Sequence, residues 1–368
     1  MVERTSALSD PILLTVLIPC YNEAAIIEQT VGALRRYLEN GNWRQEREGD
    51  WEILLVDDGS SDTTASILSC LARTSSQIRF ISYPINAGQG QALRKGFDSA
   101  KGEWIFCVDA DLDYSPDHIE QFFKIANTLG AQIVIGSPYM VGGSTTGVPV
   151  SRICMSRLMN WYFRKVLRLG FHTYTSILRL YNRDIIQQLL LSTMDKDLLP
   201  EIILRSALLG TPMVEAPAHL HWKKRNRVAG RPGAGVSATI QKAARHLLWG
   251  TIENPFFFFL LPATLISLAT TWFGVALAIL FFAAYNQTTL SGLAAITGAA
   301  SDVVLSNPQT IVIFMALLNI ALILFTLGIV ILQNKIKREH DFVHLSKIYS
   351  ELRSSRLSRQ TKVNEDSD

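Results

Sequence analysis

The segment Trp104–Asp113, WIFCVDADLD, decides the fold and points to the site. It begins with a continuous apolar run, which is typical of a strand covered by helices on both faces. It ends with Asp109, Asp111 and Asp113 at alternate positions. Since side chains alternate along a strand, we expect the three carboxylates on one side of the sheet edge. Hard oxygen ligands at this density suit Mg²⁺ or Mn²⁺, and the alternative is a solvated acidic turn.

Four further apolar runs, rich in Val and Ile, resemble buried strands. These runs are TVLIP, EILLVDD, IRFISY and QIVIGS. Between the predicted strands lie stretches with amphipathic helical spacing, at 23–39, 63–73, 90–100 and 116–129. This alternation predicts βαβ units and a doubly wound, Rossmann-like α/β sheet. Ligands of such sheets bind beyond the carboxyl ends of the strands, where the acidic clusters of this chain fall.

Two other predicted strands end in residues suited to binding. In LIPCYNE, Pro19 stops the strand, Tyr21 offers an aromatic face to a base, and Glu23 can accept from a base or ribose. A strand followed by a capped helix would look similar. In LLVDDGSSD, the adjacent carboxylates of Asp57 and Asp58 repel each other unless a base, a ribose hydroxyl or a cation satisfies them.

The composition divides the chain into a polar body and an apolar C-terminal region. Charged residues make up 18% of the 368, and Asp302 is the only charged residue between Glu253 and Lys335. A net charge of +3 is too small to argue for nucleic acid as a partner. The four cysteines lack metal-binding spacing, and the start of the chain lacks a signal-peptide pattern, so we expect the body in the cytosol.

Two apolar stretches, 256–284 and 311–333, are long enough to cross a membrane. They hold roughly 29 and 23 residues against the about 20 that a bilayer requires. A buried core hairpin is the alternative. Basic residues flank both stretches and are missing from 286–308, so both ends are expected in the cytoplasm and this loop outside. The expected domains are a catalytic body (1–240), a juxtamembrane and transmembrane region (241–334) and a basic cytoplasmic tail (335–368).

Four motifs in order, PCYNE, VDDGSSD, NAGQGQALRKGFDSAKG and DADLD, resemble those of family-2 glycosyltransferases of the GT-A fold. The resemblance spans roughly Leu14–Lys242 and is greatest to the polyprenyl-phosphate hexosyltransferases. It implies a GT-A domain followed by a transmembrane hairpin. The implied reaction moves a sugar, with inversion, from a UDP- or GDP-sugar to undecaprenyl or dolichyl phosphate at the cytoplasmic membrane face.

The resemblance also implies roles for individual residues. The nucleotide-binding candidates are Pro19, Tyr21, Glu23, Val56, Asp58, Asp109 and Ala110. The implied ligands of Mg²⁺ or Mn²⁺ are Asp111 and Asp113, which with Arg225 are the catalytic candidates. The candidates for binding phosphate or the acceptor are Arg152, Arg179, Arg225 and Arg227.

The chain departs from these relatives at two motifs. Where they carry G-[ST]-R-Y, this chain has GSPY with Pro138, and where they carry D-x-T-G-G-F-R it has TYTSILR, which keeps Arg179 but has Thr173 for the Asp. A phosphate acceptor is already anionic and needs no general base. A hydroxyl acceptor would need one, for which Asp197 and Glu201 are the candidates.

Other functions stay open at the level of sequence. A polysaccharide synthase is one, although the Q-x-x-R-W motif of those enzymes is missing and two helices are few to line a channel. A non-catalytic nucleotide-sugar-binding membrane protein is another, although an idle acidic cluster would only cost stability. His219 and His221 alternate as on a strand, where a structural role is favoured over zinc. The nucleotide base, the sugar and a homo-oligomeric state are not determined.

Overall fold

The computed structural model describes residues 12–44, 49–193, 195, 197–222 and 254–365. The chain divides into two compact units. Unit 1 comprises Met1–Gly233 and Asp341–Asp368, and unit 2 comprises Ala234–His340. The predicted domain boundary near residue 240 lies outside the described residues and stays a prediction.

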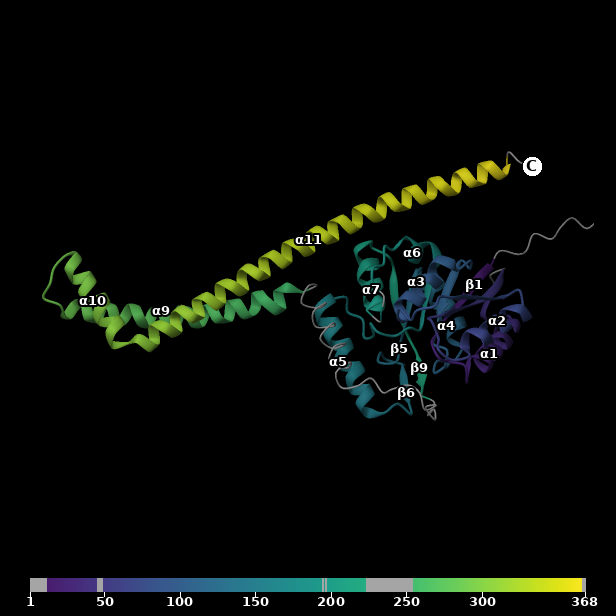
Figure 1. Ribbon diagram of the computed structural model, residues 1–368, viewed down its shortest axis with the longest axis horizontal. Helices are drawn as coiled ribbons and strands as arrows, with labels where there is room; N and C mark the ends of the chain where they lie inside the picture. Colours follow the sequence, from purple (N-terminus) through teal and green to yellow (C-terminus); the bar gives the residue numbers. More distant parts are fainter. Residues whose placement is uncertain (1–11, 45–48, 194, 196, 223–253, 366–368) are drawn as a thin grey trace, which may run out of the picture. The chain divides into compact units, whose positions relative to one another are not determined.

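Unit 1, which holds the strands labelled β1 and β5 in Figure 1, is built on a seven-stranded sheet. The strand order is β3-β2-β1-β4-β7-β5-β8. Its strands are β1 (Ile12–Cys20), β2 (Asp50–Asp57), β3 (Ile78–Ser82), β4 (Trp104–Cys107), β5 (Ile133–Ser137), β7 (Arg179–Asn182) and β8 (Met213–Pro217). Every residue of β4 and β5 is buried, and nearly every residue of β1 and β2. This burial on both faces explains why their sequences are continuously apolar.

The sheet is mixed rather than wholly parallel. β7 pairs antiparallel with both β4 and β5, and the remaining neighbours are parallel. The run ILRLY predicts a strand here, but its direction depends on the path of the chain before it. A two-stranded parallel ribbon, β6 (Ser144–Thr146) and β9 (His219–His221), confirms the strand spacing of the two histidines.

Several helices of unit 1 contribute apolar residues to the core that covers this sheet. On α1, Ile27, Val31 and Leu34 recur at helical spacing and join the hydrophobic core. The helices are α1 (Ile27–Glu39), α2 (Thr64–Thr74), α3 (Gln89–Ser99), α4 (His118–Leu129), α5 (Val150–Leu167), α6 (Arg183–Gln188) and α7 (Leu198–Leu208), with a short 3₁₀ turn at Asn42–Arg44. Helices α1 to α4 each overlap a stretch that the sequence predicts as helical, and their boundaries differ from the prediction by a few residues.

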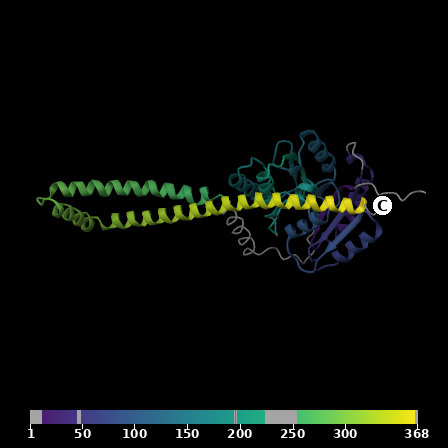
Figure 2. The same ribbon diagram turned by 90° about the horizontal axis from the view of Figure 1, so that it is seen from above.

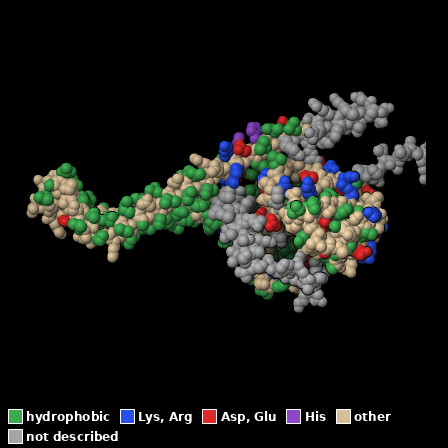
Figure 3. Space-filling model, in the orientation of Figure 1, with side chains coloured by type: hydrophobic (Ala, Val, Ile, Leu, Met, Phe, Trp, Pro, Cys, Tyr) green, Lys and Arg blue, Asp and Glu red, His purple; other side chains and the backbone are tan. Residues whose placement is uncertain are grey.

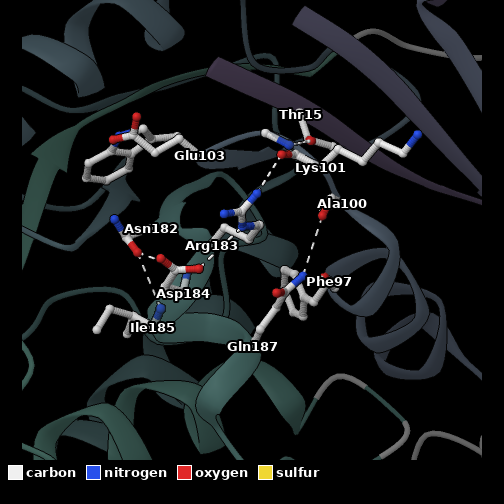
Figure 4. A network of polar contacts seen from close by, with 12 residues as sticks. Thr15, Phe97, Ala100, Lys101, Glu103, Asn182, Arg183, Asp184, Ile185 and Gln187 are labelled. Atoms are coloured by element: carbon white, nitrogen blue, oxygen red, sulfur yellow. Dashed lines mark hydrogen bonds and ion pairs between the residues drawn. The ribbon is translucent and has the colours of Figure 1, made fainter. Parts of the chain in front are cut away.

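Hydrogen bonds close the amino end of the sheet (Figure 4). Arg183, at the start of α6, donates from Nη1 to the Lys101 carbonyl (2.7 Å) and from its backbone N–H to the Glu103 carbonyl (2.9 Å). Gln187 donates to the Phe97 carbonyl (2.6 Å). These bonds fix α6 to α3 and to the start of β4.

A buried carboxylate lies at the same end. Glu52, only 1% exposed, accepts from the Thr15 hydroxyl (2.6 Å) and the Lys101 backbone N–H (2.8 Å). Its other oxygen accepts from the Arg79 guanidinium at 2.7 Å. A buried carboxylate is tolerated when hydrogen bonds and an opposite charge compensate the lost hydration, and Glu52 has both.

Unit 2 consists mainly of long apolar helices. Their hydrophobic side chains are coloured green in Figure 3. A short π-helix, η2 (Phe256–Leu260), continues into α9 (Leu261–Gln287), and α11 (Pro308–Glu365) begins in this unit. Both apolar segments have the length and composition of membrane spans, and little of either is buried within the protein. The predicted Rossmann-like α/β domain followed by two long apolar helices is therefore confirmed.

The two apolar helices lie side by side (Figures 1 and 2). Glycines mark their close approach, since a Cβ at Gly328 would lie 2.7 Å from Leu260 and one at Gly274 would lie 3.2 Å from Phe314. Small residues let apolar helices approach closely where the surroundings give no hydrophobic driving force.

The region between the spans and the predicted tail differ from expectation. The predicted loop 286–308 contains a helix, α10 (Leu293–Ser306), whose Ala295, Ala299 and Val303 are buried at a spacing of four residues. The tail predicted at 335–368 continues as part of α11 to Glu365. The sequence of α10 is short and rich in Ala, so its buried and exposed faces differ little in hydrophobicity. This explains why the sequence did not indicate the helix.

Candidate active site

Three chain segments leave the sheet at its carboxyl edge. β1 is parallel to β2 and β4, with Cys20 opposite Asp57 and Leu17 opposite Cys107. The segments that follow are 21–23, 57–58 and 108–113, which carry most of the predicted nucleotide and metal residues. The structure thus gathers at one edge residues that are up to 92 positions apart in the sequence, from Tyr21 to Asp113.

The loop after β1 is held in an uncommon backbone conformation. Asn22 has φ 55°, a left-handed conformation that Asn adopts more readily than most residues. Its N–H donates to the Ser60 hydroxyl (3.0 Å), and its side-chain oxygen accepts from the Ser61 N–H (2.8 Å). The Glu23 N–H donates to the Thr64 hydroxyl (2.9 Å). These bonds join the loop after β1 to the loop after β2.

Protein donors satisfy both adjacent aspartates. Asp57, 1% exposed, accepts from the Ser82 hydroxyl (2.8 Å) and the Ser60 N–H (3.2 Å). The neighbouring Asp58 is 3% exposed. It accepts from Tyr83 Oη (2.7 Å), Asn86 Nδ2 (3.1 Å), the Ala87 N–H (2.8 Å) and the Gly88 N–H (2.9 Å). Asp58 therefore fixes the turn before α3.

The environment of Asp58 also affects its phenolic partner. Burial, and then the hydrogen bond to the Asp58 carboxylate, raise the pKa of Tyr83 above its ordinary value. Tyr83 accordingly stays a donor at neutral pH. Gly88 has φ 98°, in the region that favours glycine, and this lets its N–H turn back toward Asp58.

The acidic segment forms a turn rather than the end of a strand. β4 ends at Cys107, and Leu112 has φ 48°, a left-handed conformation that is uncommon for a bulky residue. The Asp113 N–H donates to Asp111 Oδ1 (3.2 Å). The prediction that strand alternation orders the acids is therefore wrong. Strain of this kind concentrates at functional sites.

Neighbouring elements hold this turn in place. Gln89 Nε2 donates to Asp109 Oδ1 (3.0 Å), and the Thr30 hydroxyl donates to the Ala110 carbonyl (2.6 Å). The Asp113 carbonyl accepts from the His221 N–H of β9 (2.8 Å). Helices α1 and α3 and strand β9 therefore all fix the acidic segment.

The described residues contain no group of three or more His, Cys, Asp or Glu that could by itself hold a metal ion. Asp111 is half-buried, and Asp113 is 8% exposed. These two carboxylates fit a cation whose remaining ligands come from phosphate and water, which is how Mg²⁺ is commonly held. A ready-made cage of three acids, as expected from the spacing, is not among the described residues.

The remaining nucleotide candidates differ in accessibility. Pro19, Tyr21 and Glu23 are half-buried at the edge. Val56, by contrast, is 0% exposed within β2, and Ala110 is 4% exposed. The side chain of Val56 thus belongs to the core and is not available to a nucleotide.

The predicted phosphate-binding arginines fall into three situations. Arg179 is 0% exposed and donates to the carbonyls of Tyr174 (2.6 Å) and Leu199 (2.9 Å), so its guanidinium serves the fold rather than a phosphate. Arg152 is exposed, with its Cζ 4.4 Å from the ring centroid of Trp222. The last two, Arg225 and Arg227, lie outside the described residues.

The two base candidates lie in α7 and just before it. Glu201 is 4% exposed and accepts from the hydroxyls of Ser192 (2.7 Å) and Thr193 (2.5 Å) and from Arg205 (2.6 Å). Burial alone would raise the pKa of Glu201, but Arg205 and these hydrogen bonds together lower it. A stabilised carboxylate is a weak base. Asp197, 7% exposed, precedes the helix.

The two departures from the expected motifs lie next to each other. The Ser137 hydroxyl, directly before Pro138, is 2.7 Å from the Thr173 hydroxyl, and both residues are buried. The positions where relatives would carry an Arg and an Asp are thus neighbours in space. Neutral residues, Pro138 and Thr173, occupy both positions.

Several residues that shape the site had no clear signal in the sequence. Tyr83, Asn86 and Gln89 contact the acids Asp58 and Asp109. Tyr83 and Asn86 come from the loop between β3 and α3, and Gln89 is the first residue of α3. No local pattern predicts such contacts across 20 or more positions. The glycines of NAGQG were the one available sign of a special turn.

Comparisons with known proteins agree with this arrangement. Residues 15–190 match the family described as Glycosyl transferase family 2. Over 184 residues the chain is 30% identical to a polyprenol monophosphomannose synthase of Mycolicibacterium smegmatis, covering 49% of this chain and 65% of that protein. Over 163 residues it is 32% identical to a dolichyl-phosphate beta-glucosyltransferase of Trichomonas vaginalis, covering 44% of this chain and 46% of that protein. The chain therefore contains a glycosyltransferase family 2 domain, with homologues among polyprenyl-phosphate sugar synthases.

One solved structure extends over more of the chain. A mannosyltransferase from Pyrobaculum calidifontis, in complex with GDP-Man and Mn²⁺, is 17% identical, with coverage of 95% of this chain and 90% of that one and a TM-score of 0.40. Likeness at this score carries no conclusion about ligands. The chain covers less than two thirds of the length of each of the two sequence relatives.

Proposed function

We propose that the protein is an inverting glycosyltransferase that moves a sugar from a UDP- or GDP-sugar to a polyprenyl phosphate at the cytoplasmic face of a membrane. The observation that carries this proposal is the match of residues 15–190 to glycosyl transferase family 2. The two relatives of this chain described above are named as a polyprenol monophosphomannose synthase and a dolichyl-phosphate beta-glucosyltransferase. The acidic turn at the carboxyl edge of the sheet supplies the site, because ligands of such sheets bind there.

The apolar helices support the membrane part of the proposal. The segments Phe256–Gln287 and Pro308–Ile348 have the length and hydropathy of spans, and little of either is buried within the protein. Helices with so little protein cover need another apolar environment, which a bilayer provides. In this proposal both ends of the chain are cytoplasmic and α10 belongs to the outer side.

Residues at the carboxyl edge of the sheet would bind the nucleotide sugar. Pro19, Tyr21, Glu23 and Asp109 contact the nucleotide. Asp58 positions the turn before α3 through its bonds to Ala87 and Gly88. We assign contacts with the diphosphate or the acceptor phosphate to Arg152, Arg225 and Arg227, because guanidinium groups bind phosphate with paired hydrogen bonds.

Asp111 and Asp113 would hold Mg²⁺ or Mn²⁺. The hydrogen bond from the Asp113 N–H to Asp111 Oδ1 keeps both carboxylates in one turn. A divalent cation held by the hard oxygen ligands of these two aspartates would supply positive charge for the diphosphate as it leaves.

A phosphate acceptor agrees with the state of Glu201. Its lowered pKa and its bonds from Ser192, Thr193 and Arg205 make it a poor proton acceptor. An acceptor hydroxyl would need a base near the operating pH, whereas an anionic phosphate oxygen attacks without one. Glu201 therefore has a structural role in this proposal.

The test is a transfer assay with the purified full chain. Labelled UDP- and GDP-sugars are incubated with undecaprenyl phosphate and Mn²⁺, and the products are separated by extraction into organic solvent. A labelled glycolipid that depends on the added lipid phosphate is the expected result. A polymer, transfer only to a hydroxyl acceptor, or no transfer with any donor would overturn the proposal.

A further inference from the structure

The outward face of α5 (Val150–Leu167) is unusually apolar for a helix of a water-exposed body. Four large apolar side chains are exposed by more than half of their surface: Val150 (75%), Met155 (56%), Leu158 (56%) and Trp161 (55%). Cys154 is exposed beside them. The opposite face is buried through Asn160, Phe163 and Val166. A contiguous exposed apolar face of this kind marks an interaction surface.

The charges of α5 all have one sign. The helix sequence VSRICMSRLMNWYFRKVL contains no Asp or Glu. The exposed basic side chains on it or at its C-terminal cap are Arg152, Arg157, Arg164, Lys165 and Arg168. An exposed helix facing water alone normally carries charges of both signs. The combination of Trp and Leu with exclusively basic flanks is typical of helices that lie in the headgroup region of an anionic bilayer.

The helix is also joined to the neighbourhood of the site. Arg152 Cζ lies 4.4 Å from the ring centroid of Trp222, and Arg157 Cζ lies 5.5 Å from that of Tyr139. Tyr139 follows β5, and Trp222 follows β9, whose His221 bonds to Asp113. α5 lies at the margin of unit 1, next to β6 (Figure 1). A surface that holds α5 would therefore also hold these loops in place.

We propose that the outward face of α5, defined by Val150, Cys154, Met155, Leu158 and Trp161, docks unit 1 on the headgroup region of an anionic phospholipid bilayer. The apolar side chains enter the acyl boundary, and the basic side chains contact lipid phosphates. This inference rests on the membrane anchoring proposed above but not on the proposed sugar transfer. Charge complementarity favours a lipid surface over a protein partner, because the face offers positive charge without a single acid.

The chain supplies its own reporter. Cys154 lies on the proposed face, and the other exposed thiol is Cys70 of α2. Cys20 and Cys107 are buried, and burial raises the pKa of both thiols, so neither competes for a thiol reagent. A C70S chain labelled at Cys154 with an environment-sensitive fluorophore is compared with a C154S chain labelled at Cys70. Both full chains are reconstituted in phosphatidylglycerol-containing vesicles with and without doxyl-labelled lipids.

We expect the label at Cys154 to be quenched by the doxyl lipids at least about twice as strongly as the label at Cys70. Vesicles of phosphatidylcholine alone, or raised salt, should reduce this difference because the basic flanks are then less attracted. Leu158→Glu with Trp161→Glu should remove it. The matched control is Leu129→Glu, another exposed apolar residue (62%) on α4, which should leave it unchanged.

The outcomes separate the two proposals. If the chain does not float with vesicles at all, the membrane anchoring fails. If the chain floats but Cys154 and Cys70 are quenched equally, the docking of α5 is overturned while the anchoring stands. Oxidative cross-linking of Cys154 between two copies, insensitive to lipid charge, would likewise overturn it by showing that the face contacts a second chain.

Discussion

At the amino end of the sheet the buried Glu52 accepts from the Arg79 guanidinium, whereas at the carboxyl end Asp57 and Asp58 accept only from neutral donors among the described residues. All three carboxylates are at most 3% exposed. The amino end therefore compensates its charge within the protein, and the carboxyl end keeps its charge. Retained buried charge costs stability, so it is expected where a ligand or cation uses it.

The strongest test of this comparison removes a charge at the carboxyl edge. Asp111→Asn keeps the size of the side chain but should reduce sugar transfer at least about 100-fold, because stabilisation of the leaving diphosphate is lost. Thermal stability should be unchanged or higher. Asp117→Asn, an exposed acid at the start of α4, is the control and should transfer normally. Transfer by Asp111→Asn at the wild-type rate would contradict the assigned role.

A charge removed at the amino edge should have the reverse effect. Glu52→Gln leaves Arg79 without its carboxylate and is expected to lower the free energy of unfolding by about 2–3 kcal/mol, measured by chemical denaturation. Residual transfer per folded molecule should stay near the wild-type value. Glu39→Gln breaks the exposed Arg35–Glu39 pair instead and should cost under about 0.5 kcal/mol. Equal losses in the two variants would remove the distinction between the edges.

Glu201 extends the comparison to a second buried carboxylate with a cationic partner, which is Arg205. Its pKa is lowered, so its stabilisation is present above the ordinary value of 4.5 and is lost as the pH falls through the lower folded value. Glu201→Gln should therefore cost about 1–2 kcal/mol at pH 7, and the difference from wild type should shrink below pH 4.5. If the difference in unfolding free energy between wild type and Glu201→Gln stays constant across this pH range, the ionised form of Glu201 does not stabilise the fold.

The smallest effect is expected for a neutral donor at the carboxyl edge. Gln89→Ala removes the bond to Asp109 Oδ1 and should lower kcat/KM about 3- to 10-fold, equivalent to one neutral hydrogen bond. The melting temperature should not move. Gln29→Ala, on the exposed face of α1, is the matched control. No change in kcat/KM would show that Asp109 is oriented without Gln89.

Much of the fold could be predicted because buried strands and helices have characteristic patterns of apolar residues in the local sequence. Strands covered on both faces are continuously apolar, and helices such as α1 repeat apolar residues every three or four positions. The common edge of β1, β2 and β4 follows from parallel connections, so the grouping of Tyr21, Asp58 and Asp109 could also be expected. The antiparallel β7 could not, since strand direction has no local signature.

The sequence alone determined the strand–helix alternation, the acidic edge and the two long apolar helices, because each depends on residues that are close together in the chain. Three features depend on the folded structure: Asp58 holds the turn at Gly88, Arg179 donates to backbone carbonyls, and the acids after β4 form a turn. Those outcomes depend on contacts between distant segments. A side chain's role is set by which donors and acceptors surround it, and packing brings these together.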